Sequence, residues 1–292
     1  MDFDKINQIN KTLQFISGGE GQGSNIKRLS YLGWCLLFIS CSPNTKEPTS
    51  IPYDSFSEKK ELVVSKPADF TVEQIRVVPD FSRFRDVNEK KEAFFCFLKP
   101  IIDEENELLR KSRNRMLAIF HHTSKGGIIN EADMTWLCEN AKKLRVRNFD
   151  LYDSKSRLAL EKKLDIIPEA MCLAQAANES AWGTSLFATK ANNFFGQWCF
   201  RPGCGIVPAN RPAGANHEVR KFKTVNASVR SYMTNLNKHR AYRKMWELRY
   251  QERKNNGTPS GFTCAGGLLS YSAKRGEYVK EIRAIIKKNK LE

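Results

Sequence analysis

The segment from Pro168 to Trp182 places the strongest constraint on the fold. Its alanines and larger apolar residues recur at helical spacing, so one face of the helix they predict must be buried in a core. Proline is favoured in the first turn of a helix, and Gly183 is a residue that ends one. The chain therefore needs further helices to cover this segment.

Further helices are predicted on both sides of this segment. Apolar residues recur at helical spacing over 86–119, with a break at Pro100 because proline interrupts helical hydrogen bonds. Additional helices are expected after Asn130 and after Asp153, and helical spacing returns toward the C-terminus. Residues 197–224 have no helical period and predict a hairpin or small β-lobe. The predicted fold class is mainly α (α+β).

A short apolar run near the N-terminus predicts export. Residues 31–40 follow Lys and Arg and precede Cys41, and the run is too short to cross a bilayer, which needs about 20 residues. A basic flank, a short apolar core and a small residue before a cleavage point are the parts of a secretory signal. The sequence FISC also resembles a lipobox with acylated Cys41, although Phe38 stands where Leu is usual. A buried core segment is the alternative.

The chain is strongly basic. It has 48 lysines and arginines against 32 aspartates and glutamates, a formal net charge of +16 in 292 residues. Such a field favours an anionic partner, for example nucleic acid, an acidic membrane surface or a cell-wall polymer. The basic run 239–254 is interpreted as a solvated helix face, because no nucleic-acid-binding signature accompanies it. We therefore expect no nucleic-acid partner.

Eight cysteines are compatible with an oxidising compartment. Cys199 and Cys204 enclose a Pro-Gly turn, so a small loop closed by a disulfide is predicted there. A zinc site is the competing interpretation, but the chain has no CxxC pair and its four histidines lack metal-ligand spacing. We expect no metal and no other cofactor.

Residues 173–198 contain a single acidic side chain, Glu179. Near the C-terminal end of an apolar helix, water is scarce and the negative end of the helix dipole is close, and both effects disfavour a carboxylate. A carboxylic acid in such a setting can protonate a glycosidic oxygen. The alternative is an ordinary carboxylate that caps or pairs at a helix end.

The residues around Glu179 resemble the family-73 glycoside hydrolases, the glucosaminidases of bacterial cell walls, and within them the Bax-like group. That family carries a Glu-Ser-x-Trp-Gly-x-Ser run followed shortly by Asn-Asn-Leu/Phe-Phe-Gly. The matching positions are Glu179, Ser180, Trp182, Gly183, Ser185, Asn192, Asn193, Phe194, Phe195 and Gly196. The resemblance extends over roughly residues 70–287 and implies a lysozyme-like fold with a groove between an α-lobe and a small β-lobe.

The resemblance also implies the roles of two carboxyl groups. Glu179 would be the general acid. Glu218, in the β-like segment, would activate water or stabilise the oxocarbenium ion, and an ordinary hairpin charge is the alternative. Inverting and N-acetyl-assisted retaining mechanisms both stay open, because the separation of the two groups is not written in the sequence.

A sugar-binding groove is implied as well. Aromatic rings can stack on the C–H faces of sugars, and amide side chains can bond N-acetyl groups, whereas core packing or loop support is the alternative for each residue. The candidates are Asn193, Phe194, Gly196, Gln197, Trp198, Tyr232 and Tyr242.

Four regions are expected along the chain. They are a leader with the signal- or lipobox-like segment (1–41), a flexible tether rich in Ser, Pro and Thr (42–62), an N-terminal helical region packing on the catalytic domain (63–150) and a lysozyme-like glucosaminidase domain (151–292). We expect localisation in the cell envelope, either periplasmic or anchored in the outer membrane through acylated Cys41.

The predicted function is that of an exported endo-β-N-acetylglucosaminidase, a monomer that cleaves peptidoglycan glycan strands. A muramidase or lytic transglycosylase on the same substrate is the nearer alternative, since these enzymes share a lysozyme-like core with one glutamate. The alternative from another class is a non-catalytic cell-wall glycan-binding protein. The presence of both Glu179 and Glu218 argues against that last possibility.

Overall fold

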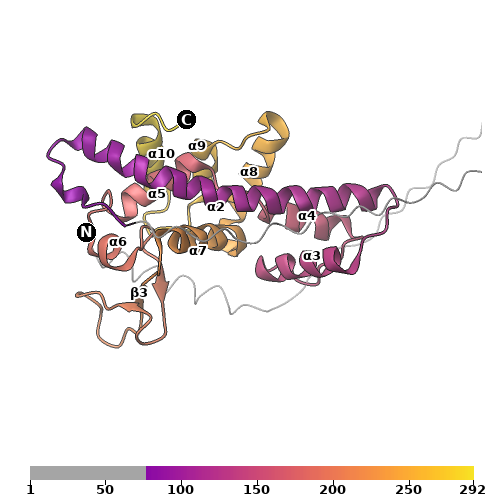
Figure 1. Ribbon diagram of the computed structural model, residues 1–292, viewed down its shortest axis with the longest axis horizontal. Coiled ribbons are helices and arrows are strands. Elements are labelled where there is room, and N and C mark those ends of the chain that lie inside the picture. Colours follow the sequence, from indigo (N-terminus) through magenta and orange to yellow (C-terminus); the bar gives the residue numbers. More distant parts are fainter. Residues whose placement is uncertain (1–76) are drawn as a thin grey trace, which may run out of the picture.

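The computed structural model describes residues 77–292. The leader, the tether, Cys41 and the first part of the 63–150 region lie outside these residues. Over the described part, the chain is mainly helical with one small antiparallel sheet (Figure 1). The predicted fold class is therefore confirmed.

The long helix α2 runs along the molecule, and in the view of Figure 1 the helices α8 and α10 lie above it, whereas α3, α6 and the sheet lie below it. In chain order the elements are η2 (Phe81–Arg83), α2 (Val87–Ser124), α3 (Glu131–Lys143), α4 (Ser154–Lys163), α5 (Glu169–Glu179), α6 (Leu186–Ala191), β1 (Trp198–Cys199), β2 (Gly205–Ile206), β3 (Glu218–Arg220), α7 (Val225–Lys238), η3 (Arg240–Tyr242), α8 (Arg243–Asn256), α9 (Gly261–Cys264), η4 (Ala265–Gly267) and α10 (Gly276–Lys288).

Helix α2 continues through Pro100, so the break predicted there is wrong. Proline lacks the N–H that would bond the carbonyl four residues earlier, at a cost of about 3 kcal/mol. Both Cys96 and Pro100 are exposed, so water can reach that carbonyl. On the opposite face Phe94, Leu98 and Ile101 are fully buried. Burial of each such side chain stabilises the fold by about 1.5–3 kcal/mol. The three side chains together therefore outweigh the cost of the proline.

Two hydrophobic clusters form the interior. The larger one joins the first half of α2 to α5, α7 and α10. The smaller one joins the second half of α2 to α3 and α4. Because α2 contributes to both clusters, the described part of the 63–150 region packs directly on the rest of the chain, whereas a domain boundary at residue 150 stays a prediction.

Helix α5 lies at the centre of the larger cluster. Its N-cap is Pro168, so the helix predicted to begin there is confirmed, and eight of its eleven residues are buried. Small side chains let neighbouring backbone approach α5 closely. A Cβ built on Gly261 of α9 would lie 2.7 Å from the backbone nitrogen of Met171. The alanines of this segment therefore reflect a helix covered on nearly all sides.

The helices predicted after Asn130 and Asp153 are also confirmed. The Asn130 side chain accepts the backbone N–H of Asp133, and the Asp153 carboxylate accepts the N–H groups at the start of α4. These side chains satisfy N–H groups that lack a partner within the helix. Within residues 77–292, no helix combines the length and the hydrophobicity needed to cross a membrane.

The predicted β-lobe is present as a three-stranded antiparallel sheet in the order β1-β3-β2. In this register Cys199 pairs with Glu218, and Gly205 pairs with Arg220. A Cβ at Gly205 would lie 2.0 Å from the carbonyl oxygen of Val219, so this position requires glycine. The sheet projects beside α6 and α7 (Figure 1).

Candidate active site

Helix α5 ends at Glu179 because the residues that follow leave helical geometry. Ala181, Trp182 and Gly183 have positive φ values of 51°, 58° and 80°. Such values suit glycine but cost roughly 1–2 kcal/mol for each other residue. The buried Ser180 hydroxyl fastens the turn, accepting the Gly183 N–H at 2.8 Å. The turn leaves the Glu179 side chain at the end of a buried helix.

The Trp-Gly pair of the motif anchors this turn to α2 and η2. The Trp182 ring packs edge-to-face on Phe94 and Phe95, with ring centres 5.7 and 5.4 Å apart. Phe81 lies directly against Gly183, where an added Cβ would fall 2.3 Å from the ring. These two motif residues therefore position the helix end.

Two asparagines hold the loop that follows α6. Asn192 ends the helix in the left-handed conformation and donates to the carbonyl of Phe222 at 3.0 Å. Asn193 is buried, accepts the N–H of Gln197 at 3.1 Å and donates to the carbonyls of Gln197 and Arg220 at 2.8 and 2.9 Å. Asn193 thus ties the loop to strand β3.

This loop brings Gly196 against Glu179. Gly196 has a φ of 61°, and a Cβ built on it would lie 3.6 Å from Oε2 of Glu179. Gly196 is also exposed. A residue without a side chain therefore borders this carboxyl oxygen and leaves the space beside it open.

A buried chain of hydrogen bonds reaches the other oxygen of Glu179. The Tyr232 hydroxyl donates to Oε1 of Gln175 at 2.5 Å, and Nε2 of Gln175 donates to the Tyr278 hydroxyl oxygen at 2.9 Å. Tyr278 in turn donates to Oε1 of Glu179 at 2.8 Å. The Gln175 amide accepts from Tyr232 through its oxygen and donates to Tyr278 through its nitrogen, so the Tyr278 hydroxyl has to donate its own proton to Glu179. Oε1 of Glu179 is therefore an acceptor, and a proton on Glu179 is directed to Oε2.

Burial raises the pKa of Glu179, and the hydrogen bonds from Tyr278 and Asn178 oppose this effect without cancelling it. Burial and the nearby Glu179 charge also hold the pKa of Tyr278 well above its usual value, so the phenol stays a donor. Glu179 therefore keeps its proton to a higher pH than an exposed glutamate does.

Tyr271 joins the C-terminal region to the loop at Gly196. Its ring stacks on Tyr278 with centres 5.3 Å apart, and its hydroxyl donates to the carbonyl of Phe195 at 3.2 Å. The side chains that hold Glu179 thus come from α5, α7 and α10 and from the segment before α10.

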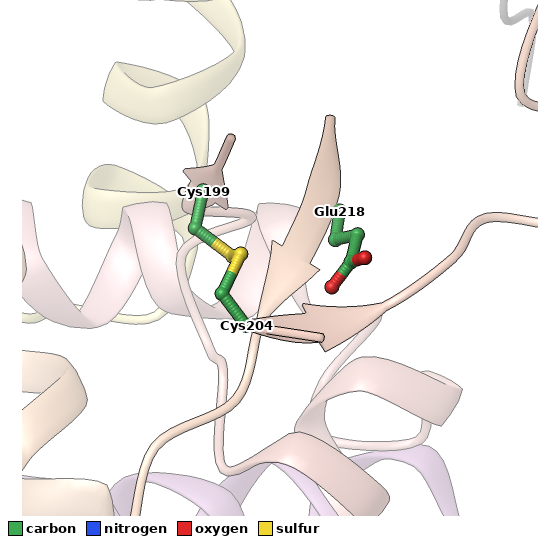
Figure 2. A group of neighbouring side chains, drawn as sticks. All are labelled: Cys199, Cys204 and Glu218. Atoms are coloured by element: carbon green, nitrogen blue, oxygen red, sulfur yellow. A yellow bond between two sulfur atoms is a disulfide. The ribbon is translucent and has the colours of Figure 1, made fainter. Parts of the chain in front are cut away.

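Glu218 lies on β3 beside the predicted disulfide between Cys199 and Cys204, which the structure contains (Figure 2). One carboxylate oxygen accepts the N–H of Gly203 at 2.9 Å, and the other accepts the N–H of Gly205 at 2.7 Å. The sulfur and carboxylate atoms lie within 4.8 Å of one another, but the sulfurs are bonded to each other and offer no thiolate ligand. Glu218 therefore binds the loop that the disulfide closes.

These two backbone hydrogen bonds lower the pKa of Glu218, so it stays a carboxylate. Glu179 and Glu218 thus differ in the direction of their pKa shifts because desolvation is the largest effect on Glu179, whereas the two backbone hydrogen bonds are the largest effects on Glu218. Neighbouring His217 has a lowered pKa, caused by burial and then by the charge of Arg211.

Three of the aromatic residues predicted to contact sugar lie in the core. Phe194 is fully buried, and Tyr232 is buried in a stack with Phe195 whose ring centres are 3.8 Å apart. Burial also raises the pKa of Tyr242 to about 12. Their rings expose no face to a ligand. Phe194, Tyr232 and Tyr242 are therefore core residues, which is the alternative considered for each of them.

The remaining candidates lie nearer the surface. Gln197 donates its amide to the carbonyl of Ser228 at 3.0 Å, so it and Asn193 both support the loop. Trp198 is partly exposed and stacks on His217 with ring centres 4.2 Å apart. Among the predicted aromatic contacts, Trp198 has the ring that a ligand can reach.

Three residues of the site were missed from the sequence: Gln175, Tyr271 and Tyr278. Gln175 is a side-chain amide between two alanines of α5, a signal that a buried polar contact is needed. Tyr278 shares the apolar stripe of α10 with Ile282 and Ile286, so its spacing indicates only burial. The contact with Glu179 joins residues 99 positions apart.

Two comparisons with known proteins found a match to this chain. Residues 155–291 match the Glucosaminidase family model, described as mannosyl-glycoprotein endo-beta-N-acetylglucosaminidase. The chain is also 29% identical over 216 residues to "Protein bax" of Escherichia coli (strain K12), an alignment covering 73% of this chain and 74% of that protein. The chain therefore contains a glucosaminidase-family domain and is similar to Protein bax over most of its length.

The glucosaminidase-family match contains Glu179, the loop at Gly196, the sheet with Glu218, and Tyr278. It begins in α4 and so leaves out α2, which nevertheless packs on α5 and holds Trp182. No solved structure matches the chain significantly. The Bax-like alignment is longer than the glucosaminidase-family match, so the similarity extends to additional parts of the chain.

Proposed function

We propose that this protein is an endo-β-N-acetylglucosaminidase that hydrolyses the glycan strands of peptidoglycan. The observation that carries the proposal is the Glu179 carboxyl group, whose pKa is raised by burial and whose Oε2 borders the exposed Gly196. The glucosaminidase-family domain supports the glycan substrate.

Glu179 acts as the general acid. Tyr278 occupies Oε1 as a donor, so the proton of the acid form lies on Oε2, which can deliver it to the glycosidic oxygen. Protonation is needed because an alkoxide is a poor leaving group, and general acid catalysis of this kind contributes roughly 10²–10⁴-fold in rate.

Glu218 supplies the negative charge that complements the acid. Its lowered pKa keeps it ionised while Glu179 is protonated, the division of roles that paired carboxyl groups show in glycosidases. Both of its oxygens accept loop N–H groups, so a carboxylate acting on water has to give up one of these bonds. In this arrangement it stabilises the oxocarbenium ion electrostatically.

The proposed place of action is the cell envelope, where peptidoglycan lies. The apolar segment 31–40 with Cys41, outside the described residues, supports export and anchoring. The Cys199–Cys204 disulfide supports an oxidising compartment. The corresponding test replaces Cys41 with Ser and follows membrane fractionation. Release into the soluble fraction is expected, and unchanged retention would count against lipidation.

Digestion of purified peptidoglycan, followed by mass analysis of the new chain ends, tests the activity. We expect reducing N-acetylglucosamine ends. Anhydromuramic ends would assign a lytic transglycosylase, reducing muramic acid ends a muramidase, and binding without cleavage a non-catalytic protein. Glu179→Gln should lower kcat by about 10³-fold, because amide cannot donate the proton. Glu169→Gln, at the other end of α5, is the matched control.

A further inference from the structure

A concave site distinct from the candidate active site lies between the end of α3, the segment that follows it and the end of α7. It is an open cavity of about 990 Å³, here named the basic cavity. Six cationic side chains line it: Lys142, Arg145, Arg147, Lys163, Lys238 and Arg240. Aspartate and glutamate are absent from its lining within the described chain.

The cations of the basic cavity have no carboxylate partner among residues 77–292. Lys163 donates only to the backbone carbonyls of Leu144 and Arg145. Burial, followed by the charge of neighbouring Arg145, lowers the pKa of Lys163 and of Lys238. Repulsion among these cations is unfavourable, and a bound anion would relieve it.

A row of neighbouring aromatic rings connects the basic cavity to the candidate active site through the core. His239 lines the cavity, and its ring centre is 6.0 Å from that of Tyr242. The row continues from Tyr242 to Tyr271 at 6.2 Å and on to Tyr278, which bonds Glu179. In Figure 1, α7 lies between β3 and α3, so its C-terminal end leads from the sheet toward the cavity.

The chemistry of the cavity suits a ligand that is both anionic and partly apolar. Beside the cations, the apolar side chains of Ala141, Val146 and Phe149 line it. A small inorganic anion would leave this apolar surface unused. Peptidoglycan carries on alternate sugars a short peptide with free carboxylates and alanine methyl groups, and arginine and lysine bind carboxylates through charge-assisted hydrogen bonds.

We propose that the basic cavity binds the acidic peptide branch of the peptidoglycan strand. This inference rests on the proposed function, because the peptide branch belongs to the proposed substrate. The cavity holds the branch through its carboxylates while the glycan lies beside Glu179. The enzyme thereby binds strands that carry peptides in preference to bare glycan.

Isothermal titration calorimetry with N-acetylmuramoyl-L-alanyl-D-glutamate tests the site directly. This compound has no glycosidic bond to a second sugar, so its binding does not depend on catalysis. We expect the parent protein to bind it at least about tenfold more tightly than the form with both glutamyl carboxylates amidated. The difference should shrink as ionic strength rises.

The double variant Lys142→Gln/Arg240→Gln should weaken binding about tenfold. Both side chains are exposed, so folding should be retained, and Arg147→Gln is a second variant of the same kind. The control Lys111→Gln/Lys288→Gln removes equal charge from exposed positions outside the cavity lining. Equal weakening by the control would show a general field effect and overturn the proposal.

Two further outcomes would also overturn it. One is equal affinity for the acid and its diamide. The other is binding of tripolyphosphate at the cavity without binding of the muramoyl peptide, which would assign a phosphate-bearing ligand. The two proposals fail separately. Peptide binding without peptidoglycan cleavage contradicts the glycosidase, and cleavage without peptide binding contradicts the basic cavity.

Discussion

Glu179 is set apart by what each of its two oxygens contacts. Oε1 accepts from Tyr278 at the end of a buried hydrogen-bond chain, while Oε2 borders a glycine. Burial disfavours the charge and the Tyr278 hydroxyl favours it, and burial is the larger effect. Both the catalytic pH range and the cost of this residue to stability depend on that balance.

Replacing Tyr278 by Phe removes the donor to Oε1. The carboxylate loses stabilisation, so the pKa of Glu179 rises further and the basic limb of the kcat–pH profile moves to higher pH. The buried Gln175 amide also loses its acceptor, the Tyr278 hydroxyl, which lowers the free energy of unfolding by about 1–2 kcal/mol. Tyr271→Phe is the control, since its hydroxyl bonds the carbonyl of Phe195. An unmoved limb in Tyr278→Phe would contradict the role of this bond.

Glu179→Gln is expected to stabilise the fold at neutral pH. A carboxyl group whose pKa is raised in the folded state opposes folding increasingly as the pH rises above its unfolded-state pKa, and glutamine carries no charge. We expect Tm at pH 7 to rise by about 2–4 °C, or roughly 1 kcal/mol. Below about pH 4 both states are neutral and the difference should vanish. A lower Tm at pH 7 would contradict this expectation.

The turn after α5 and the loop after α6 are the elements that place the carboxyl group. The turn packs on α2 and η2 through Trp182 and Gly183, and the loop is tied to β3 through Asn193. Each element therefore links the end of α5 to a different part of the chain.

Gly183→Ala tests the turn. The new methyl group would lie 2.3 Å from the buried Phe81 ring, at a φ of 80° that alanine tolerates poorly. We expect the free energy of unfolding to fall by about 2–4 kcal/mol in denaturant titration. Gly214→Ala is the matched control, with a φ of 79° and nothing within 4 Å, and should cost only about 1–2 kcal/mol. Equal losses would exclude the Phe81 contact as the cause.

At the scale of the whole molecule, a buried cluster of ions joins the helices behind the site. Asp165 follows α4 and forms an ion pair with Arg253 of α8 at 2.6 Å. It forms a second ion pair with Arg113 of α2 at 3.6 Å. Arg249 is fully buried and donates to the carbonyl of Ile166 at 2.7 Å. Part of the run 239–254 is therefore core, which corrects its interpretation as a solvated face.

Asp165→Asn should lower the free energy of unfolding by about 3–5 kcal/mol, because it leaves buried arginine charge without its partner. Burial raises the pKa of Asp165, but the hydrogen bond from Arg253 and the charges of Arg249 and Arg113 outweigh it, so the pKa is lowered. This stability is present above the unfolded-state pKa, near 4, and is lost as the pH falls through the lower folded-state value. Denaturant titration from pH 7 to pH 3 measures both effects.

Glu281→Gln is the control for Asp165→Asn. Its carboxylate pairs with Lys274 at 2.6 Å near the surface, where an ion pair contributes at most about 1 kcal/mol. A loss of similar size in both variants would contradict the importance of burial for the Asp165 cluster.

The sequence alone predicted those features that depend on neighbouring residues. Asn130 and Asp153 precede helices because side-chain capping acts within one turn, and Pro168 precedes α5 because its ring fixes φ near a helical value. The same locality made the loop between Cys199 and Cys204 readable, since the two cysteines are five residues apart. Pro100 was misjudged because burial of the opposite helix face, a tertiary effect, outweighs its local cost.

Only the tertiary structure decided how the site is assembled. Helical spacing marks Tyr232 and Tyr278 as buried, but not that they join Gln175 and Glu179 in one hydrogen-bond chain. Likewise, the sequence places Glu218 in a β-like segment, and only the register of β3 gives its oxygens the N–H groups that keep it a carboxylate. Motifs record which residues a site contains, whereas contacts between distant segments determine which atom holds the proton.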